Sequence, residues 1–325
     1  MAREVSLIAY PWVHFGLIDL GSVTPRAYGG AGASFSAWPV RTRAERSPRF
    51  GLTSDSEPLT RLKVTAAFER AAAAGLDTRA ALSITAALPA HVGFGAGTAT
   101  VLSALAAVAR LHDWPTSPAD LVKLSGRGRT SGVGSAAFFT GGFVVDAGQR
   151  GHPVDGCYRP SHDPQDRPPS TTTGSWPIPA DWRISLVIPE LRPTVAPDAE
   201  GGFFRSNTPV SSEDVLWQIA HLYHGMLPAL AEADLPAFAR SLAGYQRRGF
   251  KQAEIAAQPE SVRQVIADAW ELGLAAGLSS LGPAVFLVHD AATAVTEIGL
   301  DLNGCSAAGP FEFRTSGASC EVRES

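Results

Sequence analysis

The chain has 325 residues and carries 27 lysines and arginines against 31 aspartates and glutamates, a formal net charge of −4. This balance argues against a general nucleic-acid-binding protein, which usually shows a basic excess. Hydrophobic residues make up 45% of the chain, as in an ordinary globular protein with a substantial core. The three cysteines show no CxxC spacing, which favours a reducing, cytoplasmic setting over a disulfide framework. No signal peptide and no apolar run long enough to cross a membrane is recognised.

The first half of the chain predicts strands arranged around helices. Predicted strands cover residues 5–20 (broken by Pro11 and Gly16), 33–40 and 81–89, and residues 25–32 predict a turn. Predicted helices cover residues 59–75 and about 97–112, and a third begins after Ser117, where Asp120 completes a capping box. Residues 135–148 predict two strands around a pair of glycines.

The second half begins with a long connection. Residues 151–181 are rich in Pro, Ser, Thr and Asp and predict a boundary between two domains, 1–155 and 156–325. Strands are then expected at 182–190, 284–290 and 311–315, and helices at 211–230, 235–252, 259–276 and 291–300, before a frayed tail at 316–325. Strands split by helices are typical of a ferredoxin-like domain, so the whole chain predicts an α+β fold.

A glycine-rich loop precedes the apolar helix. Gly93, Gly95 and Gly97 alternate and Thr98 follows. Glycines let the backbone approach an anion closely, and the first amides of a helix then point at it. The sequence matches neither GxxxxGK[ST] nor GxGxxG. A phosphate site and a simple tight turn therefore both remain open on this loop alone.

Two further loops carry hydrogen-bond donors. In residues 125–134, Arg127 and Arg129 flank glycines and precede Thr130 and Ser131; guanidinium groups match phosphate oxygens, although a solvated turn is the alternative. The loop at 277–283, GLSSLGP, is interpreted on its own as a helix C-cap and turn. Two donor-rich loops in one domain favour a polyphosphate ligand.

The order of these segments resembles the GHMP superfamily of small-molecule kinases, and more closely the β-ribofuranosylaminobenzene 5′-phosphate synthases, which share that fold. HFGLIDL, HVGFGAGT, GRGRTSGVG with GGFVVDAG, and RGFKQAE with GLSSLGPAVF carry the resemblance from about His14 to Val288. The resemblance implies a two-domain GHMP fold, with a strand-rich N-terminal α/β domain that holds the phosphate loop and a ferredoxin-like C-terminal domain.

The same resemblance implies a reaction. An aromatic acid would attack the anomeric carbon of 5-phosphoribosyl 1-pyrophosphate (PRPP) through a ring carbon, releasing CO₂ and pyrophosphate, with Mg²⁺ as cofactor. The acceptor would be 4-aminobenzoate, 4-hydroxybenzoate or, in a branch that makes pyrazole C-nucleoside antibiotics, an aminopyrazole dicarboxylate. A homodimer is a further expectation, because GHMP relatives are often dimers.

Roles for individual residues follow from the resemblance. Asp19 is the candidate for a metal or ribose hydroxyl, His14 for the acceptor or a phosphate, and Lys251 for a carboxylate or phosphate. The predicted phosphate-binding residues are Gly93, Gly95, Ala96, Gly97, Thr98, Arg127, Arg129, Thr130 and Ser131. The predicted acceptor-binding residues are Arg205, Arg248, Ser279 and Ser280.

Departures from the family pattern leave alternatives open. Trp12-Val13-His14 stands where Arg-Leu-His is common, and Ala96 and Ala99 replace a serine and a glutamine of the glycine loop. These changes keep the phosphoribosyl donor but leave the acceptor open. The alternative functions are an ATP-dependent GHMP kinase and a non-enzymatic ligand-binding protein on the same fold.

Overall fold

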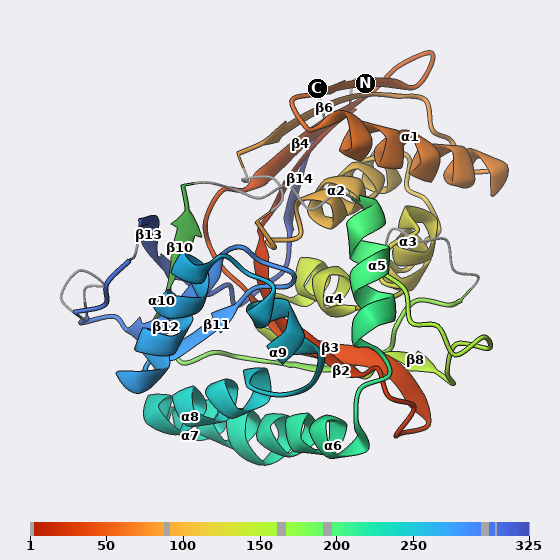
Figure 1. Cartoon of the computed structure of the whole chain (residues 1–325). Helices are drawn as coiled ribbons and strands as arrows, with labels where there is room; N and C mark the ends of the chain where they lie inside the picture. The colour runs from red at the N-terminus through yellow and green to blue at the C-terminus, as the bar shows by residue number, and fades with distance from the viewer. Residues whose placement is uncertain are drawn as a thin grey trace.

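The computed structural model describes residues 3–87, 92–160, 167–190, 197–293, 299–302 and 304–324, arranged as three sheets and the helices between them (Figure 1). The first sheet has the order β14 (Ser319–Glu324), β1 (Arg3–Ala9), β4 (Val40–Arg46), β6 (Ala80–Ala86) and β5 (Gly51–Ser54). Only the β5–β6 pair is parallel, and the crossover helix α1 (Pro58–Ala73) connects the two strands.

Helix α2 (Ala96–Leu111) packs against the first sheet and is buried on most sides. Its sequence has no polar face because α1, α3 (Pro118–Ser125) and α4 (Val133–Thr140) cover the sides that the sheet leaves open. Alternate residues of β1, namely Val5, Leu7 and Ala9, point into the same core. The helix is therefore fixed from several directions, which holds its N-terminus in place.

The second sheet contains β2 (Trp12–Asp19), β3 (Arg26–Ser34), β7 (Phe143–Asp146) and β9 (Thr172–Trp176), with β8 (Gln149–Arg150) paired to β3. Helix α4 packs directly on β3. The small residues of β3 allow this contact, since a Cβ placed on Gly32 would lie 2.6 Å from Cγ1 of Val133.

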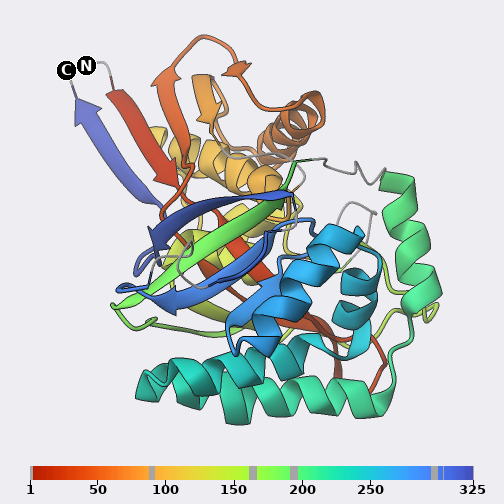
Figure 2. The ribbon, with the colours of Figure 1, turned by 60° about the vertical axis from the view of Figure 1, so that its left-hand side comes forward.

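The third sheet has the order β11 (Ala275–Leu278), β12 (Val285–Asp290), β10 (Trp182–Pro189) and β13 (Cys305–Glu312). One face packs on α10 (Glu260–Glu271) and the other belongs to the core that includes the second sheet and α8 (Leu235–Gln246). The remaining helices are α5 (Pro197–Asn207), α6 (Ser212–His221), the π-helical turn at Leu222–Met226, α7 (Leu227–Glu232) and α9 (Gly249–Ala256). Figure 2 shows α6, α7 and α8 along one side of the molecule and α5 at its edge.

The two halves of the chain share a core. The ring centroid of Phe15 on β2 lies 5.5 Å from that of Phe143 on β7 and 5.0 Å from that of Phe286 on β12. The N- and C-termini lie side by side in both views, because β14 pairs with β1 (Figures 1 and 2). The α+β class is confirmed, whereas a boundary after residue 155 stays a prediction.

Several local predictions were wrong. Most of the strand predicted at 33–40 lies between β3 and β4 instead. The predicted turn at 25–32 lies mostly in β3, because its glycines serve close packing rather than chain reversal. The first of the two strands predicted in residues 135–148 is helix α4. The tail that was predicted to fray forms strand β14, which pairs with β1. The strand was missed because it contains few apolar residues.

Other segments escaped the sequence analysis. The expected connection at 151–181 contains β9, and α5 follows β10 without having been predicted. The helix expected at 291–300 falls largely on residues 294–298, which lie outside the described residues. Within the described ranges, no helix has the length and apolar character that crossing a membrane requires.

Candidate active site

A cavity of about 170 Å³, here called the first cavity, opens where the glycine loop meets β2, α4 and the C-terminal half of the chain. Eight of the predicted site residues line it: His14, Gly93, Gly95, Thr98, Arg127, Thr130, Ser131 and Ser280. His14 and Ser280 come from opposite ends of the sequence, so this cavity forms only when the second and third sheets pack together.

The glycine loop is shaped by close packing. Gly93 and Gly95 have φ values of +92° and +75°, which glycine adopts without strain. A Cβ on Gly95 would lie 2.1 Å from Cζ2 of Trp12, and a Cβ on Gly134 of α4 would lie 2.3 Å from the same atom. The Trp12 indole therefore lies between the starts of α2 and α4, in the position where the family pattern commonly has arginine.

The N-termini of two helices border the first cavity. Gly95 is the N-cap of α2 and Gly132 that of α4, so neither N-cap residue has a side chain that could bind the first amides. In α4 the Val133 amide is bound by Ser131 instead. Unsatisfied amides and the helix dipole favour a bound anion at such ends. The buried hydroxyl of Ser135, in the first turn of α4, lines the cavity and has no hydrogen-bond partner in the described part of the chain.

Arg127 is held in place by the helix it faces. Its Nε donates a hydrogen bond to Oγ1 of Thr98 at 2.9 Å, in the first turn of α2. Burial lowers the pKa of Arg127 while the charge of Glu200 on α5 opposes that change, and Glu200 lines the same cavity. Thr130 also lines the cavity, but its hydroxyl donates its proton to the carbonyl of Arg159 at 3.1 Å. That proton is therefore not available to a ligand.

His14 and Ser131 form a pair whose proton positions can be deduced. Nδ1 of His14 accepts the Gly16 amide at 3.2 Å, so Nε2 carries the proton and donates it to Oγ of Ser131 at 2.8 Å. Oγ of Ser131 also accepts the Val133 amide at 3.2 Å. Because both lone pairs of this hydroxyl are then occupied, its own proton is available for a ligand. Burial, aided by the charge of Lys251, lowers the pKa of His14 to about 3, so the imidazole stays neutral.

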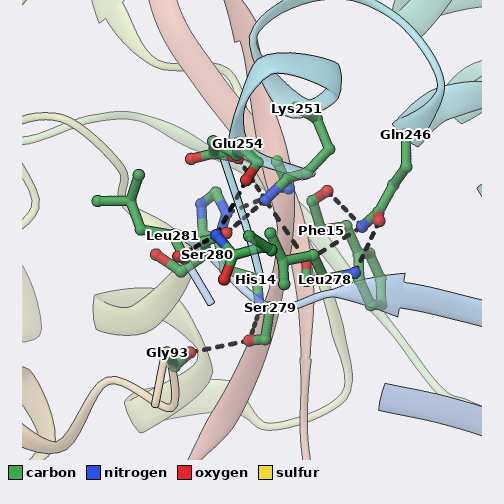
Figure 3. Close-up of polar contacts among 12 residues, drawn as sticks. His14, Phe15, Gly93, Gln246, Lys251, Glu254, Leu278, Ser279, Ser280 and Leu281 are labelled. Atoms are coloured by element: carbon green, nitrogen blue, oxygen red, sulfur yellow. Dashed lines mark hydrogen bonds and ion pairs between the residues drawn. The ribbon is translucent and has the colours of Figure 1, made fainter. Parts of the chain in front are cut away.

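Lys251 and Glu254 on α9 form a buried ion pair beside His14 (Figure 3). The Nζ of Lys251 lies 2.5 Å from Oε2 of Glu254 and donates to the Ser280 carbonyl at 2.7 Å. Burial lowers the pKa of Lys251 and raises that of Glu254. The Lys251 side chain is fully buried and does not line the first cavity, whereas Glu254 does. Glu254 therefore presents the polar group that Lys251 was expected to present.

The two serines of GLSSLGP have different positions. The Ser279 hydroxyl is buried, accepts the His14 amide at 3.1 Å and donates to the Gly93 carbonyl at 2.8 Å. It joins β2 to the glycine loop rather than facing an acceptor. Ser280 lines the cavity with φ +52° and donates its amide to the His14 carbonyl.

Several predicted site residues lie elsewhere. The Asp19 carboxylate is buried and accepts the backbone amides of Gly21, Val23 and Thr24 in the turn after β2, so it stabilises that turn and lines no cavity described here. Arg248 pairs with Glu213 at 2.6 Å and stacks on Trp217, away from the cavity. Arg129 and Arg205 also lie outside its lining.

The described residues contain no group of three or more His, Cys, Asp or Glu side chains that could hold a metal ion by themselves. Mg²⁺ in phosphate sites is commonly held by one or two carboxylates and by the substrate itself. Glu200 and Glu254 both line the first cavity and fit that pattern, whereas Asp19 does not.

Among the residues that sequence reasoning missed are Ser135, Glu200 and Glu254. Glu254 carried a signal, because it lies three residues after Lys251 and such pairs meet on a helix. Asp146 was missed as well. It is fully buried at the end of β7 and accepts the amides of Gly132 at 2.6 Å and Gly148 at 2.9 Å.

Comparisons with known proteins agree with this architecture. Residues 61–142 match the family model described as the GHMP kinases N terminal domain. Homoserine kinase from Cytophaga hutchinsonii superposes with a TM-score of 0.69 at 15% identity, covering 98% of this chain and 97% of its own. Mevalonate diphosphate decarboxylase from Staphylococcus aureus gives 0.65 at 15% identity, covering 100% and 99%. At such identity these structures show the fold alone, and they confirm the expected GHMP fold.

Curated relatives are closer in sequence. The β-ribofuranosylphenol 5′-phosphate synthase of Archaeoglobus fulgidus is 33% identical over 283 residues, 86% of this chain and 85% of that protein. The enzyme of the same name from Methanothermobacter thermautotrophicus is 32% identical over 287 residues, 86% of each chain. Both matches extend over most of this chain and most of each relative. The chain therefore belongs to the β-ribofuranosylphenol (β-ribofuranosylaminobenzene) 5′-phosphate synthase family of the GHMP superfamily.

Proposed function

We propose that this protein is a decarboxylating C-ribosyltransferase that uses PRPP. It joins C1 of the ribose to a ring carbon of an aromatic or heteroaromatic acid and releases CO₂ and pyrophosphate. The observation that carries the proposal is the meeting of two helix N-termini, Arg127 and the free Ser131 proton at one cavity. The names of the relatives, which describe a ribofuranosyl 5′-phosphate product, support the same substrate class.

The reaction requires three bond changes. The ring carbon that bears the carboxylate forms a bond to C1 as the C1–oxygen bond breaks, and pyrophosphate leaves with that electron pair. The carbon–carboxylate bond then breaks and returns its electron pair to the ring as CO₂ departs. Negative charge develops on the leaving oxygen, so cationic and amide donors already in place lower the barrier.

The acceptor lies against the side of the cavity that holds Glu254 in this proposal. An attacking ring needs high electron density, and a carboxylate that accepts a proton or hydrogen bond from a ring N–H, hydroxyl or amino group increases it. Lys251 touches Glu254 and not the cavity, so it acts as a positioning residue. This chemistry suits an aminopyrazole dicarboxylate, 4-aminobenzoate or 4-hydroxybenzoate.

Mg²⁺ is part of the proposal. When bound, the ion would neutralise negative charge on the phosphate groups of the donor. Glu200, whose charge acts on both Arg127 and Lys63, is the carboxylate that would hold it.

An acceptor panel tests the function. Purified protein with Mg²⁺ and PRPP is offered each of the three acids, and pyrophosphate and CO₂ are measured together. Equal release of both with one acid is the expected result. Conversion of ATP to ADP with a phosphorylated product, and no turnover of PRPP, would replace this proposal by the kinase alternative.

A further inference from the structure

A second cavity of about 300 Å³ lies on the other side of the glycine loop. It is lined by the start of α1 and the residues before it, including Ser56, Thr60 and Lys63, and by Gly97 of α2. Gly93, Gly95, Thr98 and Arg127 line both cavities. The glycine loop and Arg127 thus form a partition with a cavity on each side.

The second cavity is equipped for an anion. Lys63 and Arg127 both line it, and among the described residues neither forms an ion pair with a carboxylate. Burial lowers the pKa of Lys63 and the charge of Arg127 lowers it further, whereas the charges of Glu200 and Glu57 raise it. An anion between the two cations would relieve their mutual repulsion. The hydroxyl of Ser56 is buried with no partner in the described part of the chain.

Two carboxylates also line this cavity. Oδ1 of Asp55 accepts the Ala86 amide at 2.8 Å, and Glu57 is the N-cap residue of α1. Lys63 and Arg127 are the two cationic residues among those that line the second cavity.

Stereochemistry distinguishes the two sides of the partition. The pyrophosphate of PRPP is attached on the α face of the ribose, and its 5′-phosphate projects from the β face. Displacement that gives a β-riboside, as in the names of the relatives, requires the acceptor to attack from the β face. The acceptor and the 5′-phosphate therefore share one side of the sugar, and the leaving pyrophosphate lies on the other.

This inference rests on the proposed function. We propose that Lys63 and Arg127 bind the pyrophosphate of the donor in the second cavity, while its 5′-phosphate and the acceptor lie in the first. Pyrophosphate would then leave, with the electron pair of the C1–oxygen bond, through the second cavity. Ser131, whose proton is free in the first cavity, would bind the 5′-phosphate.

Calorimetry on two fragments of the donor tests the assignment. Magnesium pyrophosphate and ribose 5-phosphate are titrated into the wild type, Lys63→Met, Ser131→Ala and the control Lys123→Met, an exposed lysine on α3 that lines neither cavity. Lys63→Met should raise the dissociation constant for pyrophosphate roughly 10- to 100-fold and leave that for ribose 5-phosphate within about twofold. Ser131→Ala should weaken ribose 5-phosphate and spare pyrophosphate.

The other outcomes separate this inference from the proposed function. Unchanged pyrophosphate binding by Lys63→Met, or a loss confined to ribose 5-phosphate, overturns the assignment even where the acceptor panel succeeds. Pyrophosphate binding that depends on Lys63, together with a failed acceptor panel, keeps the anion site and removes the ribosyl transfer. ATP binding that depends on Lys63, with no binding of ribose 5-phosphate, overturns the assignment in favour of a nucleotide.

Discussion

The two sides of the first cavity differ in how they are built. One side, the glycine-loop wall, consists of residues 93–98 and 127–135 and presents amides, short hydroxyls and one guanidinium at two helix N-termini. The other, the ion-pair wall, consists of His14, Glu254 and Ser280, together with Lys251, which does not line the cavity but pairs with Glu254. Damage to the first wall should therefore reduce ligand affinity, whereas damage to the second should first reduce stability.

The largest effect is expected in the ion-pair wall. Lys251→Met leaves the Glu254 carboxylate buried without its cation and should lower the free energy of unfolding by about 3–5 kcal/mol. Urea denaturation measures the loss. The double variant Lys251→Met, Glu254→Gln removes both charges and should recover most of it. A single variant as stable as the wild type would show that the pair is not a buried structural unit.

Asp146 is a buried carboxyl group that contacts the glycine-loop wall, because it accepts the amide of Gly132. Burial raises the pKa of Asp146 to about 6, so the folded protein binds this proton more tightly than the unfolded chain does. Its contribution to stability should be fully present below about pH 4 and disappear as the pH rises through about 6, a change of about 3 kcal/mol.

Denaturation of the wild type and Asp146→Asn at several pH values between 4 and 7 tests this expectation. The wild type should gain stability relative to the variant as the pH falls. A difference that stays constant over this range would mean that Asp146 does not titrate there.

Arg127 should show that the glycine-loop wall controls affinity. Arg127→Ala removes a charged hydrogen-bond donor and should weaken PRPP binding by about 1.5–3 kcal/mol, with a smaller effect on the acceptor. Calorimetry with PRPP and with the acceptor measures the two binding affinities. Arg248→Ala, which loses an exposed ion pair away from the cavity, is the matched control and should bind both substrates normally. Unchanged donor affinity in Arg127→Ala would remove this residue from the site.

The smallest effect is expected at Ser131. Ser131→Ala removes one neutral hydroxyl and should weaken donor binding by about 1 kcal/mol, or roughly fivefold. Because His14 stays neutral, the wild-type affinity attributable to Ser131 should not vary between pH 5 and 8. A loss that appears only at one end of this range would instead identify a titrating His14 as the source of the effect.

Much of the glycine-loop wall was predictable because its features are local. Gly93 and Gly95 were expected to precede a helix that begins near residue 97, and α2 begins at Ala96. The Ser117–Asp120 capping box was recognised from its spacing and is confirmed. The turn predicted at 25–32 was wrong for the opposite reason, since the glycines of β3 allow close contacts with distant segments, such as that of Gly32 with Val133 of α4, which no local pattern reveals.

The ion-pair wall was predictable only in part. The resemblance selected His14 and Lys251, but it gave Lys251 the position that Glu254 holds. Burial decides this difference, because a lysine that is 0% exposed uses its charge on Glu254 and on the Ser280 carbonyl. Asp19 was selected for its motif, yet its carboxylate accepts hydrogen bonds from three backbone amides of the following turn.

The sequence by itself determined the α+β class, the helix that follows the glycine loop and the family. Periodicity, capping and the order of motifs depend on residue types and their positions along the chain, so they can be recognised without the tertiary structure. Only the tertiary structure decided which side chains face the first cavity, that Trp12 lies between two helix starts and that Lys63 shares a cavity with Arg127. These relations join residues far apart in the chain, and they arise when the sheets pack and burial determines which polar groups stay available to a ligand.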